Sequence, residues 1–550
     1  MRASENASGL TVQAVAGNNV VLLGMDLPPA DVEGLLGFGI ERTDHTEGER
    51  SWLTNLLRFP ASSADGRAPR GPASSEHHPL QTFRWGDYSA KPEHDYTYRV
   101  VATAGAPGDL RPVRETSVSV RTEGMRVGDH TVVFNRGATA SQLYARRFGD
   151  RRPEDVPHRE AWRWLSRGME EGILAFIGQA RDASWTLRGA FYEFSYAPVL
   201  DALRIAATSG ADVRLVVEAS DDPSSPHETN AKALAEAGLV DRVISREHST
   251  GIAHNKFLVA LHDGEPVGVW TGSTNITTGG IFGHSNVGHA VWRADVARAY
   301  LDYWEQLRGD PTTADLRTWC GEHPATPAVD AVPPAGETWL MSPRRNANAM
   351  LDFYAARARS AQKAMFLTAA FGVTKRLQPV FLEPGDALRY VLMDTARKGI
   401  DLVIREADPD NRVSVGAELP AGAFGDWVEE STHGLNGHVR YIHTKYMLVD
   451  PLSDDPLVIT GSANFSPDSV TTNDENMLVI RGDTAVADVY LTEFMRLFTH
   501  YEARYAITKR RTGRSGLSRR GGLAVDDSWT HRWYEPGSAR EKERRLFAGT

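Results

Sequence analysis

The sequence predicts a mixed α/β protein in which a small all-β domain precedes two α/β half-domains. Three observations support this expectation. Residues 10–122 contain short runs of alternating polarity, helical and strand patterns alternate from about residue 137, and one polar motif occurs twice with identical spacing. The first pattern is typical of antiparallel sandwiches, and the second is typical of α/β folds.

Composition restricts the class of protein. A chain of 550 residues with 41% hydrophobic and 24% charged residues is too long for one core and resembles ordinary soluble globular proteins. No apolar run approaches the ~20 residues that cross a bilayer, and the first residues, "MRASENASGL", lack the apolar segment of a secretory signal. We therefore expect no integral membrane segment and a cytoplasmic location.

The cysteine content and the net charge further restrict the chemistry that we expect. A single cysteine, Cys320, allows no internal disulfide and no cysteine-based metal site. The net charge of −10 argues against a generally basic nucleic-acid binder, and a locally positive groove is the alternative.

Residues 1–124 are predicted to form a β-sandwich. Turn-forming residues separate the runs "LTVQAV", "NNVVLLGM", "LQTFRW", "DYTYRVVATA" and "TSVSVRT". The run "HDYTYRVVA" at 94–102 resembles the penultimate strand of fibronectin type III domains. Another kind of small β domain is the alternative.

Each half-domain shows a helix–strand–helix–strand plan. In the first, residues 125–322, we predict a helix over 159–180, a strand over 185–194, a helix over 197–210 and a strand over 211–219. In the second, residues 340–508, we predict a helix over 349–364, a strand over 365–372, a helix over 386–399 and a strand over 400–407. The proline-rich stretch 323–339 is predicted to be a linker, and residues 509–550 a basic segment and C-terminal tail.

The repeated motif contains the residues of chemical interest. In the first copy, Ser273 and Asn275 follow Lys256 by seventeen and nineteen residues, and His254 precedes it by two. The second copy repeats these offsets with His443, Lys445, Ser462 and Asn464. On a strand, a histidine and a lysine one residue apart point to the same face.

The duplicated H-x-K with G-S-x-N resembles the phospholipase D superfamily, in which two half-domains meet about a pseudo-twofold axis. The resemblance covers about 125–508. It implies a phosphodiesterase that acts through a covalent phosphohistidine and needs neither metal nor cofactor. The alternative is a duplicated scaffold whose histidines only satisfy hydrogen bonds, but it does not explain the matched lysines, which are rarely buried without an anionic partner.

These residue types also suit phosphodiester chemistry on their own. Two lysines and two asparagine amides can hold the non-bridging oxygens and stabilise the charge that develops at phosphorus. Ser273 and Ser462 can add donors to these oxygens, and together with Asn286 they are our candidate substrate-binding residues. One neutral histidine can attack phosphorus while the other, protonated, donates to the leaving alcohol. No cluster of cysteine, histidine or carboxylate residues has the spacing of metal ligands, so we predict no metal site.

The two copies differ at the position of the later acid. Glu475 stands eleven residues after Asn464, whereas the equivalent residue of the first copy is Asn286. In the family this acid typically orients an active-site histidine. Because a carboxylate raises a histidine's pKa, we expect Glu475 to lie beside His443 and to make it the proton donor, which leaves His254 as the nucleophile.

Several other features are candidates for the surroundings of the site. His284 and His289 flank Asn286, and the strand-end residues Phe191, Tyr192 and Glu193 have a counterpart in Phe371. The irregular segment 408–437 is a candidate loop over the site, and the basic run 509–522 is a candidate contact for phosphate groups or an anionic membrane, with surface or core roles as the alternatives.

The predicted function is hydrolysis of a phosphodiester, with a phospholipid headgroup first, which would release phosphatidate and an alcohol. A metal-independent nuclease or nucleic-acid phosphodiesterase is the alternative, and a catalytically impaired phosphate-binding module is a third hypothesis. Since both half-sites belong to one chain, we expect a monomer.

Overall fold

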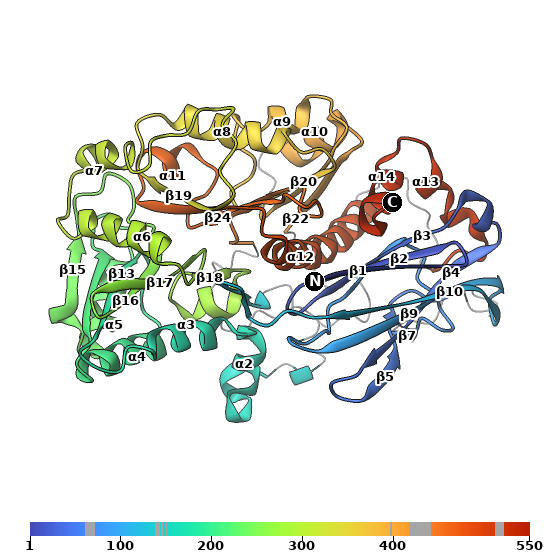
Figure 1. Cartoon of the computed structure of the whole chain (residues 1–550), viewed down its shortest axis with the longest axis horizontal. Coiled ribbons are helices and arrows are strands. Elements are labelled where there is room, and N and C mark those ends of the chain that lie inside the picture. Colours follow the sequence, from blue (N-terminus) through green and yellow to red (C-terminus); the bar gives the residue numbers. More distant parts are fainter. Residues whose placement is uncertain are drawn as a thin grey trace.

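The computed structural model places a β-sandwich beside two α/β sheets (Figure 1). It describes residues 1–60, 72–137, 144, 147–149, 151–395, 399–416, 442–511 and 522–550. None of the helices in these ranges combines the length and the apolar character that crossing a membrane requires.

The sandwich consists of two four-stranded antiparallel sheets, as predicted. The first has the order β1 (Arg2–Ala7), β2 (Leu10–Ala16), β3 (Val21–Asp26), β8 (Arg84–Asp87). The second has the order β10 (Asp109–Arg121), β9 (Asp95–Ala106), β4 (Leu35–Asp44), β5 (Glu49–Trp52), and β6 (Thr54–Asn55) pairs with β7 (Ala73–Ser74). In β10, Val118 and Val120 are buried while Ser117 and Ser119 are exposed, which is the alternation of a half-buried strand.

The first α/β sheet carries the first motif on its central strands. Its order is β11 (Arg126–Val127), β12 (His130–Phe134), β18 (Val287–Val291), β17 (Glu265–Gly272), β16 (Lys256–His262), β13 (Trp185–Phe191), β14 (Asp212–Glu218), β15 (Val243–Arg246). Its helices are α2 (Glu160–Ser166), α3 (Met169–Ile177), α4 (Ala197–Thr208), α5 (His227–Glu236), α6 (Ala294–Leu307) and α7 (Thr313–Cys320). Only β13, β14 and β15 pair in parallel.

The second sheet repeats this arrangement with the same pattern of parallel and antiparallel pairs. Its order is β19 (Gly336–Ser342), β25 (Glu475–Arg481), β24 (Leu457–Gly461), β23 (Tyr446–Val449), β20 (Ala364–Ala369), β21 (Leu388–Met393), β22 (Asn411–Val415). Its helices are α8 (Ala347–Arg359), α9 (Pro379–Leu382), α10 (Ile400–Ala407), α11 (Pro467–Thr471) and α12 (Thr484–Arg511). The duplicated α/β plan inferred from the motif is therefore present.

Two assignments in the second half were wrong. Residues 386–399, predicted as a helix, contain the strand β21, and residues 400–407, predicted as a strand, form the helix α10. All residues of β21 are buried between its parallel neighbours, and such a strand has a continuous apolar run whose periodicity does not distinguish it from a helix. In α10 only Asp401 and Ile404 are buried, one helical turn apart.

The predicted helix over 159–180 is divided in two. Arg167 and Gly168 adopt left-handed backbone conformations, with φ of 51° and 99°, between α2 and α3. On either side of this break, α2 and α3 run in different directions (Figure 1).

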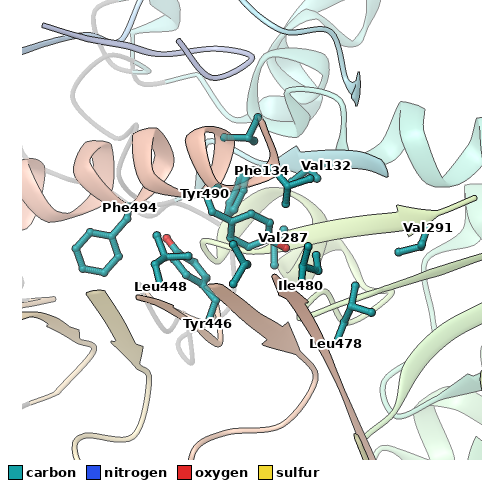
Figure 2. Packing of buried hydrophobic residues seen from close by; sticks show 14 of the residues in the cluster. Val132, Phe134, Val287, Val291, Tyr446, Leu448, Leu478, Ile480, Tyr490 and Phe494 are labelled. Carbon is teal, nitrogen blue, oxygen red and sulfur yellow. The ribbon is translucent and has the colours of Figure 1, made fainter. Parts of the chain in front are cut away.

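The two α/β sheets share one hydrophobic core, to which α6 and α12 contribute. Figure 2 shows Tyr490 and Phe494 of α12 above Tyr446 and Leu448 of β23, with Phe134 of β12 beside them. The Tyr490 ring lies 5.2 Å from both the Phe134 and the Tyr446 ring. Because each buried aromatic contributes on the order of 1.5–3 kcal/mol, this core holds the halves as one body.

The C-terminal segment packs on the sandwich. The 3-10 turn Asp527–Trp529 and the helices α13 (His531–Tyr534) and α14 (Ala539–Ala548) bring Trp529 and Trp533 into the sandwich core. Glu543 of α14 accepts a hydrogen bond from Arg84 of β8, and both side chains are buried. Residues 417–437 of the predicted active-site loop and residues 512–521 of the basic run lie outside the described residues.

Candidate active site

Both copies of the motif place a histidine and a lysine at the start of a central strand. His254 precedes β16, whose first residue is Lys256, and His443 and Lys445 precede β23. All four side chains are buried, and the histidines are 6% and 8% exposed. Each lysine Nζ donates to the backbone carbonyl of its own histidine, at 2.5 Å for Lys256 and 2.6 Å for Lys445. The local spacing of the motif therefore produces the same geometry twice.

The two halves meet through the loops that carry these residues. The backbone N–H of His443 donates to Ser285 O at 3.1 Å, and the N–H of Asp474 donates to Ile252 O at 3.0 Å. Ser285 and Asp474 immediately precede Asn286 and Glu475. Each half thus lays its acid or amide residue against the histidine segment of the other half.

Our expectation that Glu475 lies beside His443 was wrong. His254 Nδ1 lies 2.9 Å from both carboxylate oxygens of Glu475, so the carboxylate pairs with the histidine of the opposite half. The physical reason is the exchange of loops across the interface, which the order of residues along the chain does not reveal.

His443 has Asn286 as its partner. Its Nδ1 lies 2.9 Å from Asn286 Oδ1, while Asn286 Nδ2 donates to Gly280 O at 2.8 Å. Since Asn286 Oδ1 accepts, His443 Nδ1 donates, and its Nε2 carries the lone pair of a neutral ring.

The two serines orient these partners. Ser273 Oγ donates to Asn286 Oδ1 at 2.8 Å, and Ser462 Oγ donates to Glu475 Oε2 at 2.6 Å. All four side chains are fully buried. For Ser273, Ser462 and Asn286, which the sequence suggested as substrate-binding residues, we propose instead that they hold the imidazoles in position.

Asn275 and Asn464 occupy the remaining motif positions. Asn275 Nδ2 donates to the carboxylate of Glu193, which fixes the amide with its NH₂ toward that acid. Oδ1 of Asn275 and Oδ1 of Asn464 are buried, and neither accepts a hydrogen bond from the described part of the chain. These free carbonyl oxygens can accept only from a donor, so an oxygen of a phosphate would have to approach the NH₂ groups of the two amides instead.

Burial determines the charge state of the site. It lowers the pKa of His254 to about 4, although Glu475 acts in the opposite direction, and it lowers the pKa of His443 well below the usual value, assisted by the charge of Lys445. Burial also lowers the pKa of Lys256 to about 8. Burial alone would raise the pKa of Glu475, but His254 and Lys256 outweigh it and lower that pKa. At neutral pH the empty site therefore has neutral imidazoles and an ionised Glu475.

A buried amide network that the sequence analysis missed connects the halves behind Glu475. Asn476 Nδ2 donates to Asn255 Oδ1 at 2.8 Å, and Asn476 Oδ1 accepts from the hydroxyls of Thr271 and Tyr300 at 2.6 and 3.1 Å. Asn255 Nδ2 donates to Tyr303 Oη at 3.2 Å. Asn255 stands between His254 and Lys256 and Asn476 follows Glu475, and this adjacency was the available signal.

Some of the other candidate residues border the active site, and others lie in the hydrophobic core. The His284 ring lies 5.7 Å from the His443 ring, and the Tyr192 ring lies 5.2 Å from the His254 ring, so both border the site. His289 is buried in the core, where it contacts His130 and Tyr490 at 2.9 Å each. Phe191 stacks on Phe194 in the core of the first half.

Comparisons with known proteins identify both halves. The family model described as the PLD-like domain of cardiolipin synthase matches residues 173–308 and 377–498. No curated protein sequence matches the chain.

Solved structures that resemble the chain come from several organisms. Phosphatidylserine synthase from Haemophilus influenzae is 13% identical, with 63% of this chain and 92% of that chain covered and a TM-score of 0.42. Nuc, a phospholipase D family member from Salmonella typhimurium, is 25% identical, with 26% and 86% covered and a TM-score of 0.21. A mutant of yeast tyrosyl-DNA phosphodiesterase is 12% identical, with 56% and 84% covered and a TM-score of 0.34.

The duplicated motif, the repeated sheet and the match of the family model to both halves agree. The chain therefore contains two PLD-like domains in a single polypeptide.

Proposed function

We propose that the protein cleaves a phosphodiester through a covalent phosphohistidine on His254. The observation that carries this proposal is the crossed pairing of the two imidazoles. One is held by a buried carboxylate and the other by an amide, next to two buried lysines. Such a site offers two different imidazoles to one phosphate.

The first step forms a bond from His254 Nε2 to phosphorus and breaks the bond from phosphorus to the leaving oxygen. His443, which is neutral at pH 7 before substrate binds, takes up a proton when the anionic phosphodiester lies beside it, and its Nε2 then gives that proton to the leaving oxygen. Lys256, Lys445 and the amides of Asn275 and Asn464 hold the non-bridging oxygens, where negative charge develops.

In the second step water replaces the histidine. His443, now neutral, takes a proton from the water, and the oxygen attacks phosphorus. The bond from phosphorus to nitrogen breaks, and its electron pair returns to His254 Nε2. His254 is then restored, and the proton on His443 either passes to the next leaving group or is lost to water when the product leaves.

The partners support this division of roles. The attacking imidazole becomes positively charged as its bond to phosphorus forms, and the Glu475 carboxylate at Nδ1 stabilises that charge. The amide of Asn286 gives no such stabilisation, so protonated His443 is the stronger acid and the better donor. Glu475 therefore orients the attacking imidazole, contrary to the role that we assigned from the sequence.

We further propose a phospholipid headgroup ester as the substrate. The match to a PLD-like domain described for cardiolipin synthase supports this choice, and the net charge of −10 disfavours a long nucleic-acid footprint. A nuclease is the second candidate. Purified protein given labelled phospholipid and labelled DNA side by side in EDTA should release the lipid headgroup. Turnover of DNA alone would replace this substrate, and loss of all activity in EDTA with rescue by a divalent ion would refute the mechanism.

The intermediate can be trapped. In His443→Ala, p-nitrophenolate can still leave from a p-nitrophenyl phosphodiester without a proton donor. Water is no longer activated to hydrolyse the phosphohistidine. Phosphoprotein should therefore accumulate, with an acid-labile label that peptide mass mapping places on His254. His254→Ala should give no label, and a label on His443 in that variant would reverse the two roles.

A further inference from the structure

Glu193 is a carboxylate at the edge of the cluster that we assign to the phosphate. Its side chain is half-buried, and its carboxylate accepts the hydrogen bond from Asn275 Nδ2. Its negative charge opposes the effect of burial on the pKa of Lys256. Glu193 therefore acts on two of the groups that would hold the substrate's non-bridging oxygens.

The backbone on both sides of Glu193 is firmly held. The carbonyl of Glu193 accepts from the Ile276 N–H at 3.0 Å. The buried Asn230 side chain donates to Tyr192 O at 2.7 Å and accepts from the Phe194 N–H at 2.8 Å. The carboxylate thus projects from a segment that is fixed before substrate arrives, which is the condition for a precise recognition group.

The second half has no acid at the position equivalent to Glu193. Phe191 lies opposite Lys256 in the sheet, and the register of β20 with β23 puts Ala369 opposite Lys445. Two residues further along, the counterpart of Glu193 is Phe371. Neither the fold nor the duplicated lysine–amide cluster requires an acid at this position.

An acid here is unfavourable for an anionic substrate taken alone. A phosphodiester held by Lys256 and Asn275 brings a second negative charge close to Glu193, and like charges repel. The arrangement becomes favourable when a cation or a hydrogen-bond donor of the substrate lies against the carboxylate. A headgroup alcohol with an ammonium or hydroxyl group a few bonds from its ester oxygen carries such a group.

We propose that Glu193 is a specificity-determining residue that accepts a hydrogen bond from an ammonium or hydroxyl group on the headgroup of the phospholipid. This inference rests on the proposed function and narrows its substrate class to lipids with amino-alcohol or polyol headgroups. A headgroup without a donor would leave the carboxylate facing the phosphate.

The test compares substrates that differ only in this donor. Short-chain phosphatidylethanolamine and phosphatidylglycerol carry it, and phosphatidylmethanol of the same chain length does not. The variant Glu193→Gln keeps an oxygen that accepts from Asn275 Nδ2 but removes the charge, so it separates recognition from positioning. Glu236→Gln, on the exposed end of α5, is the matched control for the loss of one carboxylate.

In wild-type protein and in Glu236→Gln, kcat/KM should favour the donor-bearing lipids. In Glu193→Gln that preference over phosphatidylmethanol should fall by about tenfold to a hundredfold, the usual effect of a hydrogen bond to a charged group. If kcat/KM in Glu193→Gln fell equally for all three lipids, the preference for donor-bearing lipids would be unchanged. That result would show that Glu193 only positions Asn275.

Two other results are distinguishable from these. If the effect of Glu193→Gln appeared for the ribonucleotide UpU and not for the lipids, the recognised donor would be a ribose hydroxyl and the lipid class would be wrong. If wild-type protein cleaved none of the lipids or dinucleotides, the proposed function itself would fail, and this inference with it.

Discussion

Replacing Glu475 with glutamine tests the crossed pairing directly. The carboxylate lies 2.9 Å from His254 Nδ1 and accepts from Ser462 Oγ at 2.6 Å, and glutamine keeps an acceptor of nearly the same shape. The substitution therefore removes the charge and little else. If His254 is the nucleophile, the variant should form the phosphohistidine more slowly.

The size of the effect follows from the burial of the pair. The side chains are 8% and 0% exposed, so water screens the interaction weakly. A hydrogen bond to a charged group contributes about 1.5 kcal/mol or more, and a unit charge at about 4 Å in an effective dielectric of 20 contributes about 4 kcal/mol. At about 1.4 kcal/mol per factor of ten, the first step should slow by roughly tenfold to a thousandfold.

Rapid-quench measurement of a single turnover gives the rate of this step. Two diesters should be compared, one releasing p-nitrophenolate and one releasing an alkyl alcohol that needs a proton. As a nucleophile's partner, Glu475 should matter equally for both, so Glu475→Gln should slow both to a similar extent. Glu265→Gln, at the exposed start of β17, is the control.

A different dependence on the leaving group would refute the reasoning. If Glu475→Gln slowed the alkyl ester and spared the p-nitrophenyl ester, Glu475 would be supporting a proton donor, and His254 would be that donor. A change of less than about threefold in both rates would mean that the carboxylate does not stabilise the charge on the attacking imidazole.

Two further predictions follow from the site. With a p-nitrophenyl ester, kcat/KM should rise through pH of about 4, where His254 loses its proton and becomes nucleophilic, and fall through about 8, where Lys256 loses its charge. A pH–rate profile checks this, and Lys256→Arg should abolish the alkaline fall, because guanidinium stays protonated; a fall that persisted would assign it to another group. Asn476→Ala should lower the free energy of unfolding by about 1–3 kcal/mol, because the hydroxyls of Thr271 and Tyr300 lose their shared acceptor. Thermal unfolding measures this loss, and a melting temperature equal to that of wild type would show that the network relaxes without cost.

Much of the candidate site could be predicted from the sequence because its offsets are local. A histidine and a lysine on one face of a strand, and a serine and an asparagine after the next strand, keep their spacing wherever the strands pair. Two copies of the motif with identical spacing predicted the two α/β halves and the resemblance to the phospholipase D superfamily. The alternating runs before residue 124 predicted the antiparallel sheets.

The sequence pattern did not distinguish a strand from a helix where burial on both faces of an element removed the alternation of polar and apolar residues. Both β21 and α10 contain five apolar residues, and the parallel neighbours β20 and β22 determine which of the two is the strand. The C-terminal helices are a similar case, because the tryptophans that join the sandwich core lie more than 400 residues from its last strand along the chain.

From the sequence alone we could predict the proposed catalytic residues, because their spacing relative to the strands is set within about twenty positions. Only the tertiary structure decided which partner each histidine has. Glu475 lies 221 residues from His254, and Asn286 lies 157 residues from His443. These contacts form because two similar halves pack face to face, and each then presents its acid or amide loop to the histidine of the other.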